Sequence, residues 1–217
     1  ICGGGVVISG AEPALAWLAR LIDMPVATTV SGQGAISETD PHSVGVVGSN
    51  GGVASTRAVV EEADLVLFIG CRAGSVTTER WRIPGPGVRI IHVDSDSQVI
   101  GANYPTEVAI VADAASALKA LGDAIEARGV SVSHGGEARA KAAWALKLRN
   151  FLPLARSAEL PIKPERVIET LSRLLDDDAI VVAATGTPCP YFSAHYSRRL
   201  PASATPLPPP TCHLALI

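Results

Sequence analysis

The chain has 217 residues, which is enough for one or two domains with a sizeable core. Apolar residues make up 47%, charged residues 18%, and the formal net charge is -3. This balance gives no electrostatic basis for binding nucleic acid or a membrane surface, and no apolar run reaches the ~18 residues of a membrane span. We therefore expect a globular protein whose partners are small molecules.

The four cysteines, Cys2, Cys71, Cys189 and Cys212, are far apart in the sequence and form no CxxC or His-paired zinc pattern. A chain of this size does not need a disulfide framework, so we expect free thiols in a reducing, cytoplasmic setting. Each cysteine is interpreted as a small buried hydrophobe rather than a nucleophile.

The first residues, Ile1 and Cys2, precede the glycine triplet Gly3–Gly5. Glycine runs of this kind are typical of the carboxyl end of a β-strand, where the backbone turns sharply. Because the triplet lacks the full GxGxxG spacing, it predicts either a tight strand-to-helix turn or a weak phosphate site. Residues 11–22 then show helical periodicity, residues 26–29 are a short buried strand, and residues 31–52 are a long Gly/Ser/Asn-rich loop.

Strands and helices continue to alternate up to about residue 127. We expect a helix over residues 53–62, buried strands over 65–69 and 88–93, a short strand in "EVAIVAD", and a helix over 114–127. This alternation predicts an α/β fold with a doubly wound, parallel, Rossmann-like sheet. In such a sheet ligands bind beyond the carboxyl ends of the strands, where the glycine triplet and the loops would meet.

A second unit follows a polar, Gly-rich linker over residues 128–136 and a connecting helix over 137–151. The stripe Trp144, Leu148, Leu152 on that helix is interpreted as packing rather than as a cofactor face. Pro164 begins a helix with apolar residues at 167, 168, 171, 174 and 175 on its inner side, and "AIVVAA" is a buried strand. The proline-rich segment after Tyr196 predicts an irregular tail.

Three polar side chains at strand ends are candidates for binding. Asp94 and Asp96 follow a buried strand and favour either hydrogen bonds to ribose hydroxyls or a capped, solvated turn. Arg72 favours either a phosphate clamp or a surface ion pair. No pair of carboxylates is placed for acid–base catalysis, and His42, His92 and His195 are interpreted as structural.

An ordered set of motifs resembles one family. The segments "PVATT", "GQGAIS", "DPHSVGVVGS", "ADLVLFIGCR", "IIHVDSDSQVIG" and "VAIVADA" occur in the order found in the central domain of thiamine diphosphate-dependent enzymes. The closest resemblance is to acetolactate synthase-type large subunits, over residues 1 to about 125. Residues 162–196 resemble the opening of that family's diphosphate-binding domain.

The resemblance implies cofactors and site residues. Thiamine diphosphate and Mg2+ are implied for the full-length enzyme, which acts on 2-oxo acids as a homodimer or homotetramer. By position, Gly186, Thr187 and Pro188 correspond to the diphosphate loop. Some relatives bind FAD across the central domain, and the matching positions along that edge are Gly48, Asn50, Gly70, Arg72, Asp94 and Asp113. No residue is assigned a catalytic or metal-binding role.

The resemblance also divides the chain. The expected parts are a central Rossmann-like domain (1–127), a linker with connecting helix (128–160), the start of the diphosphate-binding domain (161–197) and an irregular tail (198–217). The family's activating glutamate lies in a domain upstream of the glycine turn, and its "GDG" metal motif lies downstream; neither is among the 217 residues. We therefore expect a fragment, with Ile1 and Cys2 as the last residues of a strand.

Two other functions remain open. The chain is then either a stand-alone nucleotide- or flavin-binding module, which would bind a dinucleotide unaided, or a non-functional fragment without a ligand. The fragment hypothesis differs from both, because it requires thiamine-dependent activity only in the full-length protein.

Overall fold

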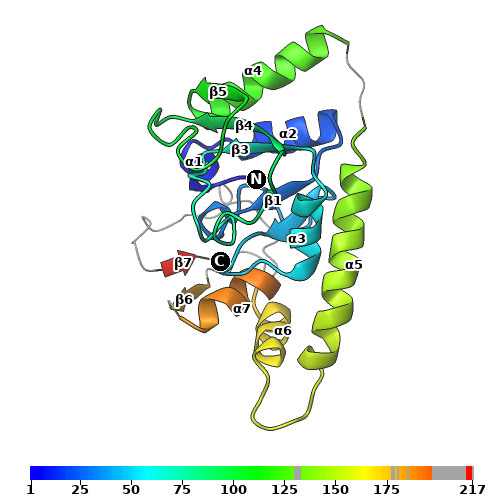
Figure 1. Cartoon of the computed structure of the whole chain (residues 1–217). Helices are drawn as coiled ribbons and strands as arrows, with labels where there is room; N and C mark the ends of the chain where they lie inside the picture. The colour runs from blue at the N-terminus through cyan, green and yellow to red at the C-terminus, as the bar shows by residue number, and fades with distance from the viewer. Residues whose placement is uncertain (130–132, 177–178, 180, 185, 197–213, 217) are drawn as a thin grey trace.

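The computed structural model describes residues 1–129, 133–176, 179, 181–184, 186–196 and 214–216 (Figure 1). Cys212 and most of the proline-rich tail lie outside the described residues, as does part of the linker. Among the described helices, none combines the length and the apolar character needed to cross a membrane.

The main sheet is parallel. Its strands are β1 (Val26–Thr28), β2 (Ser43–Val46), β3 (Leu65–Ile69), β4 (Arg89–Asp94) and β5 (Val108–Val111). β1 pairs with β2, β3 with β4, and β4 with β5, always in parallel. Cys2 forms parallel bridges to both Thr28 and Ile69, so the first residues of the chain join the two groups of strands.

Backbone hydrogen bonds show that the chain begins as a strand of this sheet. The amide of Cys2 donates to the carbonyl oxygen of Ala27 at 2.8 Å, and the carbonyl oxygen of Ile1 accepts from the amide of Ile69 at 3.1 Å. Since residues 1–3 come first in the chain, β1 and β2 second and third, and β3 to β5 fourth to sixth, the spatial order is 3-2-1-4-5-6. This is the order of doubly wound dinucleotide-binding sheets, and it confirms the predicted fold class.

Helices cover both faces of the sheet. One face is covered by α1 (Gly4–Ile8), α2 (Glu12–Leu21) and α4 (Ala114–Ala127), and the other by α3 (Ala54–Glu61) and α5 (Gly136–Ala155) (Figure 1). Successive strand residues point to opposite faces: Ile69 packs beneath α1, α2 and α4, whereas Phe68 belongs to a separate cluster on the other side. This two-sided burial explains the continuously apolar run of β3, whereas β5, at the end of the sheet, is largely exposed.

The prediction of a loop over residues 31–52 is partly wrong. It contains a 3-10 turn, η1 (Val30–Gly32), and the whole of β2, all four residues of which are buried. Ser43 and Gly45 have low strand propensity, so the two valines between and after them made only a short strand pattern in a Gly/Ser-rich segment. Pairing with β1 and packing beneath α3 and α5 impose the extended conformation.

The stripe predicted on the connecting helix is displaced by about one residue. Leu148 is 44% exposed, and the buried face of α5 is instead formed by Ala140, Ala143, Lys147, Phe151 and Ala155. The indole of Trp144 does contact the first unit, because its Nε1 donates to the carbonyl oxygen of Ser43 at 2.7 Å.

The second unit has a smaller core than predicted. It consists of α6 (Pro164–Leu174), β6 (Val182–Ala184), α7 (Pro188–His195) and β7 (Leu214–Leu216). Of the α6 side chains expected to face inward, Ile168 is buried, but Leu174 is 70% exposed. α6 contacts α5 and α7, and part of its apolar face lies outside these contacts.

Three residues of the predicted irregular tail are regular. β7 pairs antiparallel with β6, through the proline-free triplet 214–216. An apolar segment without proline can donate its backbone N–H groups to a neighbouring strand, which the preceding proline-rich segment cannot do as readily.

Asp23 fixes the start of α5 to the first unit. Its Oδ1 accepts from the amide of Glu137 at 2.9 Å, its Oδ2 accepts from the hydroxyl of Ser133 at 2.5 Å, and its backbone oxygen accepts from the amide of Gly136. His42 Nε2 lies 3.2 Å from the same carboxylate. Asp23 thus caps a helix more than a hundred residues away, and these hydrogen bonds, that of Ser133 first, lower its pKa from 3.8 to about 2.

We expect Gly3→Ala to destabilise the sheet. A Cβ at this position would collide with the carbonyl oxygen of Gly70 and lie 2.7 Å from the Cα of Cys71, and backbone atoms cannot move aside cheaply. The free energy of unfolding, measured by urea denaturation, should fall by ~2 kcal/mol or more. Gly85→Ala is the control, because its Cβ would enter open space; equal stability of the two variants would contradict this account.

We expect Asp23→Ala to loosen the start of α5 in a pH-dependent way. Because the folded pKa is lowered, the carboxylate's stabilisation is complete above the ordinary pKa of 3.8 and disappears as the pH falls through about 2. The urea midpoints of wild type and variant should differ at pH 7 and converge between pH 3.8 and about 2. Asp123→Ala, which removes an exposed pair with Lys119, should show no comparable difference; a gap that persists at the acid limit would argue against the cap.

Candidate functional site

The carboxyl ends of the main strands form one edge at which several loops meet. The chain leaves the strand at residues 1–3 through the glycine triplet, and it leaves β3 through Gly70, which has a positive φ of 53°. A Cβ on Gly70 would lie 2.7 Å from the Cα of Gly5, so the two turns touch backbone to backbone. The strand order reverses between these two strands, which is where dinucleotides bind in such sheets.

The glycine triplet serves packing rather than phosphate binding. The amide of Gly3 donates to the carbonyl oxygen of Ile69 at 2.9 Å, and the amide of Gly5 donates to that of Gly70 at 3.1 Å. Two of the three amides that could face an anion are thus occupied by the chain itself. α1 is also only five residues long, which is too short for a strong helix dipole. The tight-turn alternative is therefore the better interpretation.

The carboxylates at the strand ends form local turns and retain free oxygens. Asp94 Oδ1 accepts from the amide of Asp96 at 3.0 Å, and Asp96 Oδ1 accepts from that of Gln98 at 2.9 Å. Asp113 follows β5 and caps α4, since its Oδ1 accepts from the amide of Ser116 at 3.1 Å. Each carboxylate therefore has a structural role, and each Oδ2 remains available to a ligand hydroxyl.

Arg72 is the exposed cation of this edge. Its backbone oxygen accepts from the side chain of Asn103 at 3.0 Å, which holds the residue in place. Its guanidinium makes no hydrogen bond or ion pair within the part of the chain that the structure describes. The surface ion-pair alternative is not observed there, so the side chain is free to bind an anion.

The loop after β2 contributes two of the predicted residues. Gly48 has φ +98°, and the space beside its Cα is filled by the backbone of Val76 and Thr77. Position 48 therefore requires glycine because of this contact with the loop after β3, and not because of a ligand. Asn50 lies two residues further and is exposed, so its amide remains available to a ligand.

The loop Gly186–Pro188 lies between β6 and α7, as the resemblance implies. Gly186 has φ +105° and nothing within 4 Å of the position of a Cβ, and all three residues are exposed. A phosphate could approach the backbone here. Pro188 and Pro190 lack the N–H groups that a helix start normally offers, and the amide of Cys189 is used by the Gly186 oxygen. The donors that remain in the loop are the Thr187 hydroxyl and the amides of residues 186 and 187.

The described cysteines are buried. Burial raises the pKa of the Cys2 thiol to about 11 and also raises that of Cys71, so neither is a thiolate at neutral pH. Cys2, Cys71 and Cys189 are free thiols. Their interpretation as small core residues is consistent with this.

The histidines also have structural partners. His92 Nε2 lies 2.8 Å from the carbonyl oxygen of Cys71, and His42 lies between Asp23 and Asp40. His195 stacks on Phe151 at 4.6 Å, and its burial, with the nearby Lys147 charge, lowers its pKa to about 4. Within the described residues no three His, Cys, Asp or Glu side chains gather to hold a metal ion.

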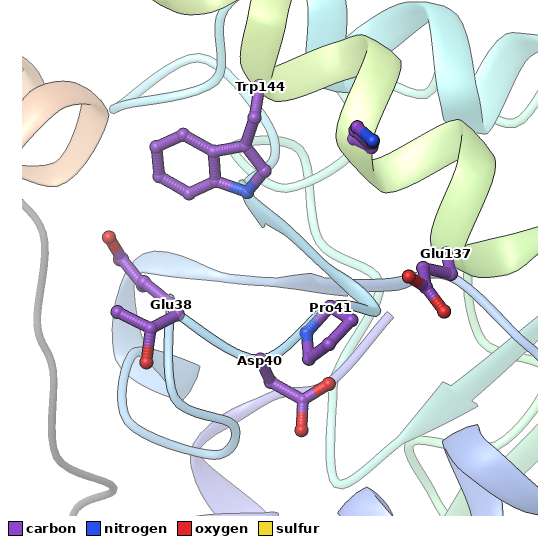
Figure 2. A pocket seen from close by; sticks show the side chains of 7 residues that line it. Glu38, Asp40, Pro41, Glu137 and Trp144 are labelled. Carbon is purple, nitrogen blue, oxygen red and sulfur yellow. The ribbon is translucent and has the colours of Figure 1, made fainter.

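A hollow of about 280 Å³ lies where the 38–41 loop faces α5 (Figure 2). Glu38, Asp40 and Pro41 face Glu137 and Trp144 across it, with Thr39 and Lys141 also in its wall. Asp40 is already paired with Arg20 at 3.2 Å and with His42. Next to Trp144 on α5 is Lys147, whose Nζ lies 3.8 Å from the centroid of the Trp144 ring and whose pKa is lowered by burial. The hollow lies between the first unit and the connecting helix, and its loop precedes β2, so it is separate from the carboxyl edge.

Sequence reasoning missed one polar residue near the edge. Gln33 is 6% exposed, and neither its Nε2 nor its Oε1 has a hydrogen-bond partner in the part of the chain that the structure describes. The "GQGAIS" motif contained this residue, but only the fold reveals that its side chain is buried and unpaired.

Comparison with known proteins identifies the family. Residues 1–121 match the model of the thiamine pyrophosphate enzyme central domain. The probable acetolactate synthase large subunit of Methanocaldococcus jannaschii is 31% identical over 213 residues, which cover 94% of this chain and 34% of that protein. The counterpart in Methanococcus aeolicus is 28% identical over 213 residues, with 94% and 35% covered.

A bacterial relative gives the same result. The acetolactate synthase large subunit of Haemophilus influenzae is 28% identical over 194 residues, which cover 89% of this chain and 34% of that protein. The chain therefore spans about a third of the length of the curated relatives it matches. The family match and the 3-2-1-4-5-6 parallel sheet confirm the predicted resemblance: this chain belongs to the thiamine pyrophosphate-dependent enzymes of the acetolactate synthase type.

Proposed function

We propose that the chain is a fragment of a thiamine diphosphate-dependent enzyme that acts on 2-oxo acids by acetolactate synthase-like carboligation or decarboxylation. The observation that carries this proposal is the match of residues 1–121 to the central-domain model, on a sheet with the dinucleotide-binding strand order. Residues 1–127 are then the central domain, 128–160 the linker, 161–197 the start of the diphosphate-binding domain, and 198–217 a tail. The full-length enzyme is proposed to be a cytoplasmic homodimer or homotetramer.

Exposed apolar side chains in the second unit support the fragment proposal. Leu160 is 84% exposed, Leu174 70%, Ile162 57% and Val182 53%. Single exposed apolar residues are ordinary on a protein surface, but here they follow one another along residues 160–182. A longer diphosphate-binding domain would give these side chains something to pack against.

The chain's own residues are proposed to bind and orient the coenzyme. Thiamine diphosphate, when bound, supplies the electron sink that decarboxylation of a 2-oxo acid requires. Gly186 leaves room for the diphosphate to approach the backbone, and Thr187 donates hydrogen bonds from its amide and hydroxyl. Pro188 starts α7 without an N–H group. Mg2+ is expected with the diphosphate in the full-length enzyme, held by groups beyond the described residues.

A second candidate function is that of a nucleotide- or flavin-binding module. The unpaired, exposed Arg72 favours it, because a guanidinium at the carboxyl edge suits a phosphate group. Asn50, Asp94 and Asp113 would contact ligand hydroxyls, while Gly48 and Gly70 keep the loops close together. Both functions are compatible, since FAD could bind at this edge of a thiamine diphosphate enzyme.

We expect the chain alone to release no CO2 from pyruvate with thiamine diphosphate and Mg2+. Transplanted into the Methanocaldococcus jannaschii relative in place of the matching 213 residues, it should restore thiamine-dependent pyruvate consumption. Introducing Gly186→Val into that chimera should raise the thiamine diphosphate concentration for half-maximal activity by roughly tenfold, because valine is strained at φ +105° and obstructs the loop. A chimera that folds, as judged by circular dichroism, but consumes no 2-oxo acid would contradict the proposal.

We expect Arg72→Ala to weaken FAD binding by roughly tenfold in isothermal titration, because it removes a bidentate phosphate donor. Arg128→Ala is the matched control, since Arg128 is also exposed but lies at the C-terminal end of α4, whose N-terminal end is at the edge. Equal losses in the two variants would indicate general charge attraction instead of a site at Arg72.

A further inference from the structure

Gln33 has an unusual energetic position. It is 94% buried, and within the described residues neither polar atom of its carboxamide has a hydrogen-bond partner. Each unpaired buried polar group costs about 1–3 kcal/mol, and native proteins contain few of them. A carboxamide with both ends unpaired calls for a partner that is not part of the described chain.

The backbone places Gln33 next to the point where the strand order reverses. Gln33 directly follows η1, whose last residue, Gly32, packs so closely on Cys2 and Gly3 that a Cβ would collide with the Cys2 oxygen. The amide of Gly32 donates to Thr29 Oγ1 at 3.0 Å, which fixes this turn. Gln33 therefore directly follows a turn that packs against the carboxyl end of the strand formed by residues 1–3.

The neighbouring polar groups are already used. Thr29 Oγ1 accepts from Gly32, the Gly32 oxygen accepts from Ala35 at 3.0 Å, and the amides of Gly3 and Gly5 donate to the turn after β3. Among the described residues, none of these groups is bonded to the Gln33 carboxamide. We take its unmet donor and acceptor as the mark of a ligand.

A primary carboxamide offers a donor and an acceptor in one plane. The complementary group is a planar edge on which an acceptor and a donor are adjacent. Glutamine recognises adenine in this way, through N7 and the 6-amino group. The pyrimidine-dione part of a flavin offers the same chemistry, with an N–H between two carbonyl oxygens.

We propose that Gln33 reads the planar amide-like edge of a nucleotide coenzyme at the carboxyl end of the sheet, and so determines which ring the site accepts. This inference rests on the nucleotide-binding function proposed above and adds a specificity residue to it. Arg72 then serves the phosphate, and Gln33 serves the ring.

The test uses the full chain and two probes that separate the two sources of this edge. ADP carries only the adenine ring and FMN only the flavin ring. Binding of each is measured by isothermal titration to wild type, Gln33→Met and Gln33→Glu. Methionine has nearly the same shape without hydrogen-bonding groups, and glutamate keeps acceptors but loses the amide donor.

We expect one probe to bind the wild type, and both variants to bind that probe roughly tenfold or more weakly, as expected when a site loses a group that pairs with its ligand. In the absence of ligand, Gln33→Met should have an unchanged or higher melting temperature, because it removes two unpaired buried groups. A better-folded variant that binds less tightly separates recognition from stability.

Ser43→Ala is the matched control. Ser43 is 1% exposed, its hydroxyl is also unpaired, and it begins β2, at the amino edge of the sheet. Its removal should leave binding of the probe unchanged. The proposal is overturned if neither probe binds the wild type, or if Gln33→Met binds as tightly as the wild type. If the chimera regains thiamine-dependent activity but Gln33→Met does not change binding of the probe, this inference alone is overturned.

Discussion

The sheet depends on the insertion of residues 1–3 between β1 and β3. Without the hydrogen bonds of Cys2 to Ala27 and of Ile69 to Ile1, the described strands would separate into a pair and a trio, because no other bridge joins those two groups among the described residues. The central position also explains the glycines that follow. Two chain turns must cross at the same edge, and only residues without a Cβ allow the backbones of Gly3, Gly5 and Gly70 to touch.

This contact joins the two turns and occupies two of the three glycine amides that could bind a phosphate. The amides of Gly3 and Gly5 are used to hold the turn after β3 in place. The proposed anion binding would then depend on side chains such as Arg72. The edge thus consists of closely packed backbone turns that carry a few exposed polar side chains. Such an arrangement is consistent with a site that recognises a ligand by its functional groups.

The sequence predicted those parts of the fold whose signal is local. Residues 65–69 and 114–127 agree with β3 and α4 residue by residue, because apolar runs and helical periodicity suffice there. β2 was missed because Ser43 and Gly45, which have low strand propensity, hid the alternation of its valines, and its pairing with β1 is a tertiary contact. The candidate site was likewise predictable only in part. Asp94 and Arg72 were expected at strand ends, but the unpaired state of Gln33 is a property of the packed fold and has no signature in the sequence.

The loop at Gly186 limits what this chain can do with a diphosphate. A helix start normally presents several free N–H groups to an anion, but Pro188 and Pro190 remove two of them and the amide of Cys189 is already bonded. Thr187 is left as the main donor, and a doubly charged diphosphate held by so few groups would remain largely solvated. Tight binding of the coenzyme therefore needs groups from outside this loop. Full thiamine-dependent activity is for that reason expected only where the other binding elements of the family are also present.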